Sequence, residues 1–479
     1  MPRQPIVCSP EIEEIHRGLE EIRADLEIPD SFPEAVLSEA AERVAAGAMI
    51  PPDSAATDVA DRTDIPLVTI DPPGSMDLDQ AFAGEQTSSG WRVYYAIADV
   101  AAWVPPGGAI DADSRERGFT MYSPDSRAPL HPPMLSEGAA SLLPDVDRQA
   151  LLWTIDLGDD GMLEEAHLER ALVRSRAKLS YRDAASLVDE GEDPVLASLR
   201  EIGVRREARE IERGAVSLRL ASQEVVRNNG AFALEYDESL PVEGWNAQIS
   251  LLTGIAAAKI MIDGGIGLLR TLPRPDERTV RELRRTARAL DIDWPASAAY
   301  ADVVRRLDPN DPRESALIAQ SARGLRGAGY EAFNGELPEH TEHSAIASDY
   351  AHVTAPLRRL GDRFANECVL AQCAGSTPPD WVVETLPELP KLLGRARNRE
   401  GSLERSVVDL VEAAVLQSRV GESFEGIITD VDEDRSRSKI QLVDPAVVAY
   451  VDGVAELGDV VTVQLTEADI DKRRVRFEL

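Results

Sequence analysis

Apolar residues recur with a helical spacing at the start of the chain. Positions three or four apart are apolar, which predicts a helix that Pro29 ends. The inner face of this helix carries Ile12, Ile15, Leu19, Ile22 and Leu26. A second helix is expected at about 33–46, with Gly47 as its end. We therefore expect residues 1–62 to form a small helical N-terminal element, with a winged-helix or helix-turn-helix arrangement as one form.

The spacing then becomes that of strands and later returns to that of helices. Apolar and β-branched residues are concentrated in three runs that predict strands: 67–70, 91–100 and 150–157. Helical spacing dominates from about 180 onward, most clearly at 246–262, 278–290, 357–374 and 385–418. Residues 63–418 are therefore expected to form one mixed α/β domain.

The last sixty or so residues change character again. Five short strand-like runs, separated by Gly, Asp and Ser turns, are expected at 423–429, 439–443, 446–451, 460–465 and 473–477. Five short strands in so small a segment indicate a closed barrel, and the OB-fold is the usual form. The chain is therefore expected to be an α+β multidomain protein whose residues 419–479 form an OB-fold β-barrel.

Composition describes an ordinary globular chain with an unusual charge. The 479 residues are 43% hydrophobic, the three cysteines do not suggest a disulfide framework, and no segment resembles a signal peptide or a membrane span, so we expect a cytoplasmic protein. The net charge of −34 argues by itself against a nucleic-acid partner. However, only five lysines occur, and the arginines gather in clusters. Arginine is well suited to bidentate contacts with phosphate.

Three aspartates follow the first predicted strand. Asp71 ends the apolar run, a Pro-Pro-Gly turn follows, and Asp77 and Asp79 come directly after the turn. Carboxylates held this close repel one another and are costly to desolvate. A hard divalent cation such as Mg²⁺ removes that cost and supports phosphodiester chemistry. The segment therefore predicts a metal site, with a solvated acidic turn as the alternative.

The sequence around these aspartates resembles the catalytic signature of the RNase II (RNB-domain) exoribonucleases. Further segments resemble that family in the same order along the chain: 69–81, 96–100, 117–122, 141–148, 177–181 and 350–359. The last of these, YAHVTAPLRR, is the most specific. The final barrel resembles the S1-type RNA-binding module of the same family, so the similarity covers about residues 65–479.

The resemblance implies a hydrolytic 3′→5′ exoribonuclease that uses Mg²⁺, or Mn²⁺ in its place, and processively releases nucleoside 5′-monophosphates. Asp71, Asp77 and Asp79 match the acidic metal-site positions of the family, and Asp79 matches the carboxylate most critical for cleavage. Arg358 matches the arginine that holds the terminal phosphate, a task suited to a permanently charged, planar group.

The family also implies how RNA is held. Tyr122 and Tyr181 match aromatic positions that stack on bases near the 3′ end. Arg359 follows the phosphate-binding arginine, and Glu404 matches a glutamate beside the RNA path. The expected partner is RNA with a single-stranded 3′ end. No membrane and no obligate protein partner are implied, so a monomer is expected.

Two departures from the family pattern affect these expectations. Gln80 stands at the fourth acidic position, where an amide oxygen can still bind a metal ion but carries no charge. The N-terminal residues are helical, whereas family members usually begin with two cold-shock-type barrels that funnel single-stranded RNA. We therefore expect a differently built entrance and better tolerance of structured RNA.

Two other functions remain open from the sequence. The departures favour a catalytically weak or inactive RNA-binding homologue as one alternative. A phosphotransferase that uses Asp77 and Asp79 as a nucleophile–acid pair is the other, but this alternative leaves Asp71, Arg358 and the terminal barrel unexplained.

Overall fold

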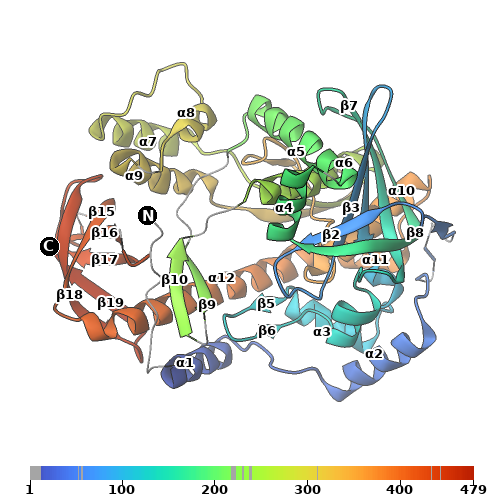
Figure 1. Ribbon diagram of the computed structural model, residues 1–479, viewed down its shortest axis with the longest axis horizontal. Helices are drawn as coiled ribbons and strands as arrows, with labels where there is room; N and C mark the ends of the chain where they lie inside the picture. The colour runs from blue at the N-terminus through green and yellow to red at the C-terminus, as the bar shows by residue number, and fades with distance from the viewer. Residues whose placement is uncertain are drawn as a thin grey trace.

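The computed structural model in Figure 1 places a mixed α/β domain beside a small β-barrel, with one long helix running from the first to the second. It describes residues 12–51, 53–54, 58–191, 193–216, 223–228, 231–236, 240–309, 311–432, 434–442 and 444–479. Within these residues, no helix has both the length and the apolar character needed to cross a membrane.

A six-stranded sheet forms the centre of the α/β domain. Its strands, in spatial order, are β1 (Ala60–Asp61), β8 (Leu163–Ser180), β2 (Leu67–Asp71), β3 (Gln80–Gln86), β4 (Gly90–Ala98) and β7 (Asp147–Gly158). The long strand β8 pairs antiparallel with β7 through its first part and parallel with β2 through its last part. Because β8 pairs both with β2 and with β7, which lies at the far end of the strand order, the sheet curls back on itself.

Helices cover this sheet and bury its apolar side chains, among them Phe82, Tyr95 and Trp153. The helices packed around it are α4 (Tyr181–Glu190), α5 (Pro194–Arg213), α6 (Pro241–Gly264) and α10 (Leu360–Cys373). The helix α12 (Leu389–Leu416) continues from this domain to the barrel, as Figure 1 shows. The helices expected at 246–262, 357–374 and 385–418 are thus confirmed as α6, α10 and α12.

The remaining elements connect these layers. The helices are α3 (Ala109–Arg117), α7 (Glu277–Ala289), α8 (Tyr300–Arg306), α9 (Pro312–Ser321) and α11 (Asp380–Thr385), with the short turns η1 (Val100–Ala102), η2 (Met134–Ala139), η3 (Ala322–Leu325), η4 (Leu386–Glu388) and η5 (Gln417–Arg419). Four two-stranded sheets are formed by β5 (Met121–Tyr122) with β6 (Arg127–Ala128), β9 (Gln223–Asn228) with β10 (Ala231–Tyr236), β11 (Ile266–Thr271) with β12 (Gly329–Asn334), and β13 (Glu342–His343) with β14 (Ser348–Asp349).

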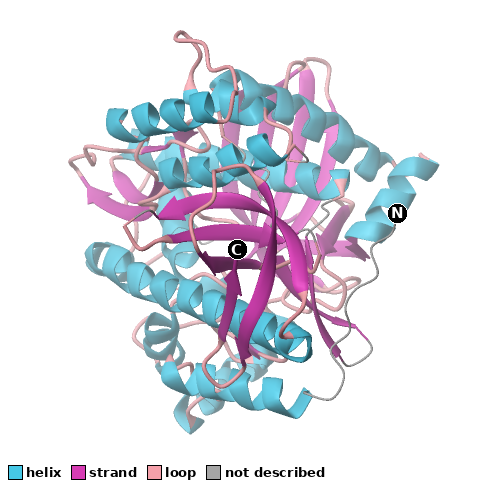
Figure 2. Ribbon diagram, turned by 90° about the vertical axis from the view of Figure 1, so that its left-hand side faces the viewer, coloured by secondary structure: helices cyan, strands magenta, loops and turns pink. Residues whose placement is uncertain are grey.

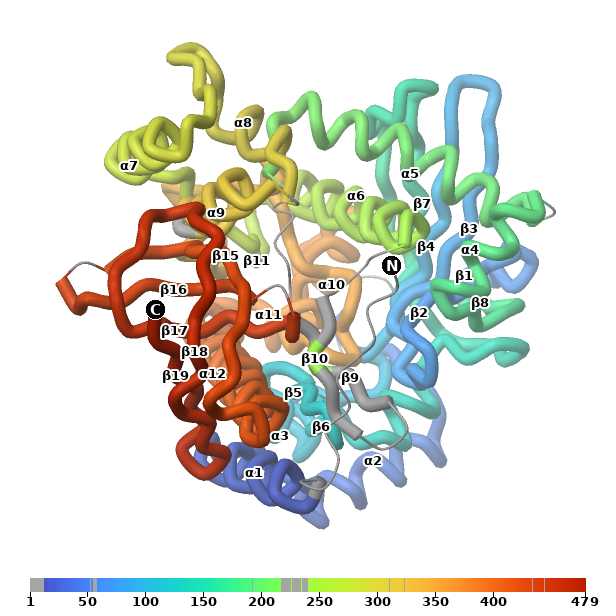
Figure 3. Tube along the Cα trace, turned by 60° about the vertical axis from the view of Figure 1, so that its left-hand side comes forward, coloured from blue at the N-terminus to red at the C-terminus, as the bar shows by residue number. Residues whose placement is uncertain are grey.

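The expected C-terminal barrel is confirmed. It closes in the order β15 (Ser423–Asp432), β16 (Arg437–Leu442), β17 (Val448–Asp452), β19 (Arg474–Glu478) and β18 (Val460–Asp469), and faces the viewer in Figure 2. Phe424 and Phe477 meet edge to face in its core. Figure 3 shows α7, α8 and α9 beside the barrel, where Gln320 of α9 donates a hydrogen bond to the Thr429 carbonyl of β15.

The described N-terminal residues are helical, as expected, but they do not form a winged helix. Helix α1 (Ile12–Asp25) packs on α12, where Gly18 lies so close to Leu410 that a Cβ would be 2.7 Å from that side chain. Helix α2 (Glu34–Ala46) instead packs on α3 and η2. The two helices thus pack against different parts of the protein, as Figure 1 shows.

Candidate active site

The candidate site lies where β2 ends. Asp71 is the last residue of β2 and pairs in register with Ser180, the residue before α4. The Asp71 side chain is half-buried, and its Oδ2 atom is buried without a hydrogen-bond partner. Burial raises the pKa of Asp71 to about 6, with Asp77 adding to the effect and Arg358 opposing it.

Asp79 is the most enclosed of the three aspartates, with 3% of its surface exposed. The main-chain N–H of Leu357 donates to Asp79 Oδ1 at 2.7 Å, and Arg358 Nε lies 3.4 Å from Oδ2. Burial nevertheless raises the pKa of Asp79 to about 8, because the charges of Arg358 and Arg359 and the Leu357 amide do not offset the desolvation of the carboxylate.

Asp77 is held by the hairpin of β5 and β6. The Tyr122 hydroxyl donates to Asp77 Oδ2 at 3.3 Å, and Arg127 Nη1 lies 3.3 Å from Oδ1. Tyr122 and Arg127 are register partners in the hairpin, so both reach the same carboxylate. Arg127 also forms an ion pair with Glu137 at 2.5 Å.

Arg358 belongs to the loop 354–359, which leads into α10. Its side chain is 46% exposed, while the main-chain N–H of Thr120 donates to the Arg358 carbonyl at 3.0 Å. Arg359 points elsewhere: its guanidinium pairs with Asp362 at 2.7 Å. Asp362 also accepts from the Ala355 N–H at 2.8 Å. Arg359 therefore contributes to the structure of the loop, and its RNA contact stays a prediction.

Gln80 is the first residue of β3 and lies beside the aspartates. Its Nε2 donates to the Thr354 carbonyl at 2.6 Å, and its Oε1 accepts from the Tyr95 hydroxyl at 2.7 Å. Both ends of the amide are thus engaged within the protein. The expected role of Gln80 as a weak metal ligand stays a prediction. The two hydrogen bonds indicate an alternative, structural role for this side chain.

The other predicted RNA contacts lie around this centre. Tyr122 is half-exposed beside Asp77, and Tyr181 begins α4 directly after the Ser180 partner of Asp71. Burial raises the pKa of Tyr181, and the Asp71 charge adds to this. Glu404 lies exposed on α12. Its partial desolvation and the charge of Glu400 raise its pKa, while Arg397 and Arg405 oppose this.

A divalent cation fits the chemistry of the three aspartates. In the part of the chain that the structure describes, no three His, Cys, Asp or Glu side chains converge closely enough to hold a metal ion, because Asp77 and Asp79 turn toward arginines. The Asp71 Oδ2 atom is buried without a hydrogen-bond partner, and burial raises the pKa of Asp71 and of Asp79 despite Arg358, so the nearby positive charge does not offset the desolvation of these carboxylates. Oxygen donors of this kind suit Mg²⁺.

Comparison with known families decides the classification. The RNB domain family matches residues 59–372, and the RNase II-type exonuclease C-terminal S1 domain matches residues 422–479. The chain belongs to the RNB family. The RNB match contains the three aspartates and Arg358, and the S1 match covers the barrel.

Relatives of this RNB protein include enzymes and an inactive protein. Ribonuclease R of Vibrio parahaemolyticus serotype O3:K6 is 27% identical over 440 residues, which cover 85% of this chain and 51% of that protein. The inactive exonuclease DIS3L2 of Arabidopsis thaliana is 28% identical over 353 residues, or 65% of this chain and 33% of that protein. The chain thus spans about half the length of its bacterial relative.

Solved structures of Mycoplasma genitalium RNase R share the fold of this RNB protein. The apo form has a TM-score of 0.87 at 19% identity and covers 98% of this chain and 78% of that one. The same RNase R has been solved with ribose methylated single-stranded RNA and with double-stranded RNA, with TM-scores of 0.86 and 0.85. At this identity the likeness shows the fold alone.

Several residues of the RNB site were not identified from the sequence. Arg127 binds Asp77, and Lys178 lies near enough to Asp71 to lower its pKa. The Ser-Pro-Asp-Ser turn after Tyr122 is the available signal for Arg127, because a hairpin there places the two residues opposite each other. Tyr95 and Ser250, whose hydroxyls are 2.8 Å apart, carry no comparable signal.

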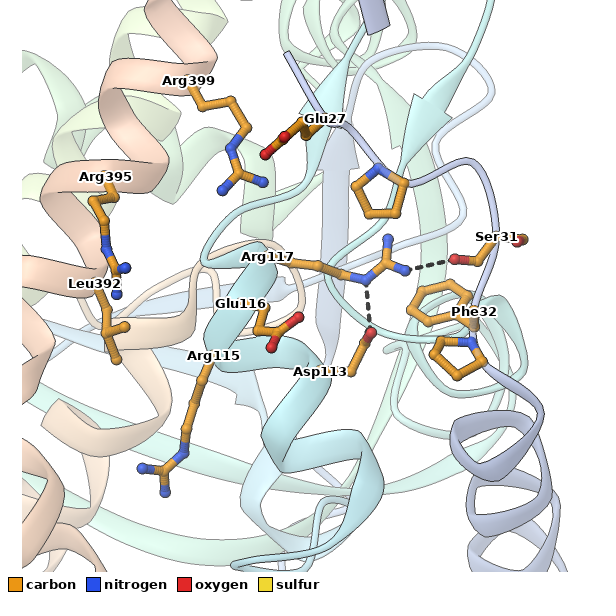
Figure 4. Close-up of a pocket in the computed structure, with 12 residues that line it drawn as sticks. Glu27, Ser31, Phe32, Asp113, Arg115, Glu116, Arg117, Leu392, Arg395 and Arg399 are labelled. Atoms are coloured by element: carbon orange, nitrogen blue, oxygen red, sulfur yellow. Dashed lines mark hydrogen bonds and ion pairs between the residues drawn. The ribbon is translucent and has the colours of Figure 1, made fainter. Parts of the chain in front are cut away.

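A cavity of about 740 Å³ lies apart from these residues, between the linker after α1, helix α3 and helix α12. Figure 4 shows Arg395 and Arg399 of α12 on one side and Glu27 and Phe32 on the other. Arg117 pairs with Asp113 at 2.6 Å inside it. Because acidic and basic groups both line it, the cavity offers no single charge for a ligand, and none of Asp71, Asp77 and Asp79 borders it.

Proposed function

We propose that this protein is a hydrolytic 3′→5′ exoribonuclease that depends on Mg²⁺, or Mn²⁺ in its place, and processively releases nucleoside 5′-monophosphates. One observation carries the proposal: Asp79 of the RNB domain pairs with Arg358 from a distant loop, and the charges of Arg358 and Asp77 both act on the nearby Asp71. A protein that only binds RNA has no need to bury carboxylates whose desolvation the neighbouring positive charge does not offset.

The three aspartates would hold the metal ion. When bound, the ion supplies an activated water and stabilises negative charge on the scissile phosphate. Arg358 binds the terminal phosphate group, because its guanidinium is half-exposed and lies against Asp79 at the floor of the site. Asp79 is the most sensitive position, since it contacts both Arg358 and the loop that carries it.

The substrate we propose is RNA with a single-stranded 3′ end, including structured RNA. Tyr122 and Tyr181 would stack on the last bases, which contributes about 1–3 kcal/mol per base without regard to sequence. Arg359 and Glu404 are proposed to lie along the RNA path. The structures of RNase R with single-stranded and double-stranded RNA support both substrate forms.

The organisation of the protein is part of the proposal. In this proposal, residues 1–62 form the helical element, residues 63–418 the RNB catalytic domain and residues 419–479 the S1-type barrel. We also propose a monomer, because a channel that threads RNA needs no partner subunit. The cytoplasmic location stays a prediction.

A catalytically weak or inactive RNA-binding protein is the second candidate. Gln80 replaces a charged group, and its amide is engaged by Thr354 and Tyr95. An inactive exonuclease is among the relatives. In its inactive form, this candidate predicts RNA binding without cleavage at any concentration of Mg²⁺.

The test is a time course on 5′-labelled single-stranded RNA with Mg²⁺ or with EDTA, followed on a sequencing gel. Shortening from the 3′ end that stops in EDTA, with nucleoside 5′-monophosphates identified by chromatography of the same reactions, supports the proposal. Intact RNA under both conditions, together with a gel shift, supports the second candidate. Cuts at internal positions would contradict both.

A further inference from the structure

The amide of Gln80 is held in one orientation by its neighbours. The Thr354 carbonyl can only accept a hydrogen bond, so the Gln80 atom 2.6 Å from it must be the NH₂ group. The carbonyl oxygen of the same amide then faces Tyr95, whose hydroxyl donates to it at 2.7 Å. Tyr95 is fully buried and its hydroxyl also meets Ser250 at 2.8 Å, so the orientation is fixed from both sides.

The carbonyl that Gln80 binds belongs to the loop that carries Arg358. Other hydrogen bonds also hold this loop: Asp362 accepts from Ala355, Asp79 accepts from Leu357, and the Arg358 carbonyl accepts from Thr120. Gln80 adds the attachment at the start of the loop, from the residue next to Asp79. The series of hydrogen bonds from Ser250 through Tyr95 and Gln80 to Thr354 therefore connects the loop to β4 and α6.

An acidic residue could not make this attachment. A carboxylate only accepts hydrogen bonds, so an ionised side chain at this position would set its charge against the Thr354 carbonyl oxygen. The Gln80 amide, by contrast, donates to Thr354 through its NH₂ group and accepts from Tyr95 through its oxygen at the same time.

We infer that Gln80 is a positioning residue, which orients the loop of Arg358 through Thr354, and that Tyr95 and Ser250 support it in place of a fourth acidic metal ligand. The inference rests on the proposed function, because its effect is on the arginine that receives the terminal phosphate. It also assigns metal binding to Asp71, Asp77 and Asp79 alone.

The experiment compares Gln80→Met and Tyr95→Phe with the wild type in Mn²⁺ affinity, measured by calorimetry or by the spin resonance of free Mn²⁺, and in kcat/KM on RNA. Both variants should bind Mn²⁺ within about twofold of wild type and lose about tenfold or more in kcat/KM. The double variant should lose no more than the worse single one, because the two residues act in one network. Gln86→Met, an exposed position on the same strand, is the matched control and should change neither value.

A second double-mutant cycle, which combines Gln80→Met with a change of Arg358, separates a positioning effect from a general loss of stability. In an Arg358→Lys background, Gln80→Met should cost less than about threefold, since its effect runs through the arginine. An equal loss in both backgrounds would overturn the inference. So would a tenfold or greater weakening of Mn²⁺ binding by Gln80→Met with no effect of Tyr95→Phe, because Gln80 would then be a metal ligand.

These outcomes can be told apart from failure of the proposed function. If the wild type does not shorten RNA, the proposed function fails, and RNA affinity in EDTA replaces kcat/KM in both cycles. The inference then still requires that Gln80→Met and Tyr95→Phe weaken RNA binding through Arg358 while Mn²⁺ affinity is kept. Unchanged RNA affinity in both variants would overturn it.

Discussion

The main-chain N–H of Leu357 donates a hydrogen bond of 2.7 Å to the Asp79 carboxylate, although the two residues are 278 positions apart in the chain. The bond places Arg358, the next residue, with its Nε 3.4 Å from the other oxygen of the same carboxylate. One buried aspartate thus joins the acidic end of the sheet to the loop that carries the arginine.

Arg358→Ala should reduce cleavage about a hundredfold or more, because the change removes a charged donor from the developing charge of the phosphate. Arg358→Lys should retain part of the activity, since a lysine keeps the charge but loses the bidentate geometry. Single-turnover rates on RNA measure both. Arg281→Lys, on the exposed face of α7 and paired with Glu277, is the control; a similar loss there would show that any arginine change is harmful.

Metal affinity should rise with pH between about 6 and 8. Without metal, burial raises the pKa of Asp71 to about 6 and of Asp79 to about 8, so protons compete with the cation below these values. The apparent affinity for Mn²⁺ should increase up to about tenfold per pH unit while one proton is displaced. Titrations at several pH values measure this, and Asp79→Asn should flatten the dependence. An affinity that is independent of pH would contradict the assignment.

Acid should destabilise the fold through His131. This side chain is 2% exposed and contacts the Pro356 carbonyl, and burial lowers its pKa to about 3. The unfolded chain takes up the proton near pH 6.5, so the free energy of unfolding is retained above that pH and falls as the pH decreases, by roughly 2 kcal/mol at pH 5.

Urea unfolding at pH 7 and pH 5 measures the effect of His131. The variant His131→Gln should be less stable at pH 7 but lose less on acidification. The exposed His340→Gln is the control and should keep the wild-type difference between the two pH values. An unchanged difference in His131→Gln would show that other groups cause the acid sensitivity.

Gly254→Ala should destabilise the protein and displace the segment that leads into the Arg358 loop. A Cβ at Gly254 of α6 would lie 2.1 Å from the Tyr350 ring and 2.5 Å from the Ala351 carbonyl oxygen. Overpacking of this kind costs about 1–3 kcal/mol. Gly244→Ala, in the same helix but facing only the end of Glu207, should be neutral or stabilising. Thermal unfolding of the two variants provides the comparison.

The sequence identified those parts of the site that are local. Asp71, Asp77 and Asp79 follow one strand within a single turn, so their proximity is a consequence of chain connectivity. The helices α6, α10 and α12 and the barrel strands were predictable because their apolar periods are long or regular.

The remaining features depend on contacts between distant segments. No spacing links Arg358 to Asp79, and only the family resemblance placed them together. The engagement of Gln80 depends on Thr354 and Tyr95, which reach it from other elements. The N-terminal helices were predicted, but an apolar face does not specify its partner, and α1 packs on Leu410 of α12 instead of on α2.

The most direct test of the account is single-turnover cleavage of 5′-labelled RNA by the wild type and by Asp79→Asn in Mg²⁺, with RNA affinity measured in parallel. Asp64→Asn, which changes an exposed aspartate before β2, is the matched control. The account predicts that the wild type and Asp64→Asn shorten the RNA from its 3′ end, while Asp79→Asn binds RNA normally but cleaves it at least about a thousandfold more slowly. Equal cleavage by Asp79→Asn, or binding without cleavage by all three proteins, would contradict it.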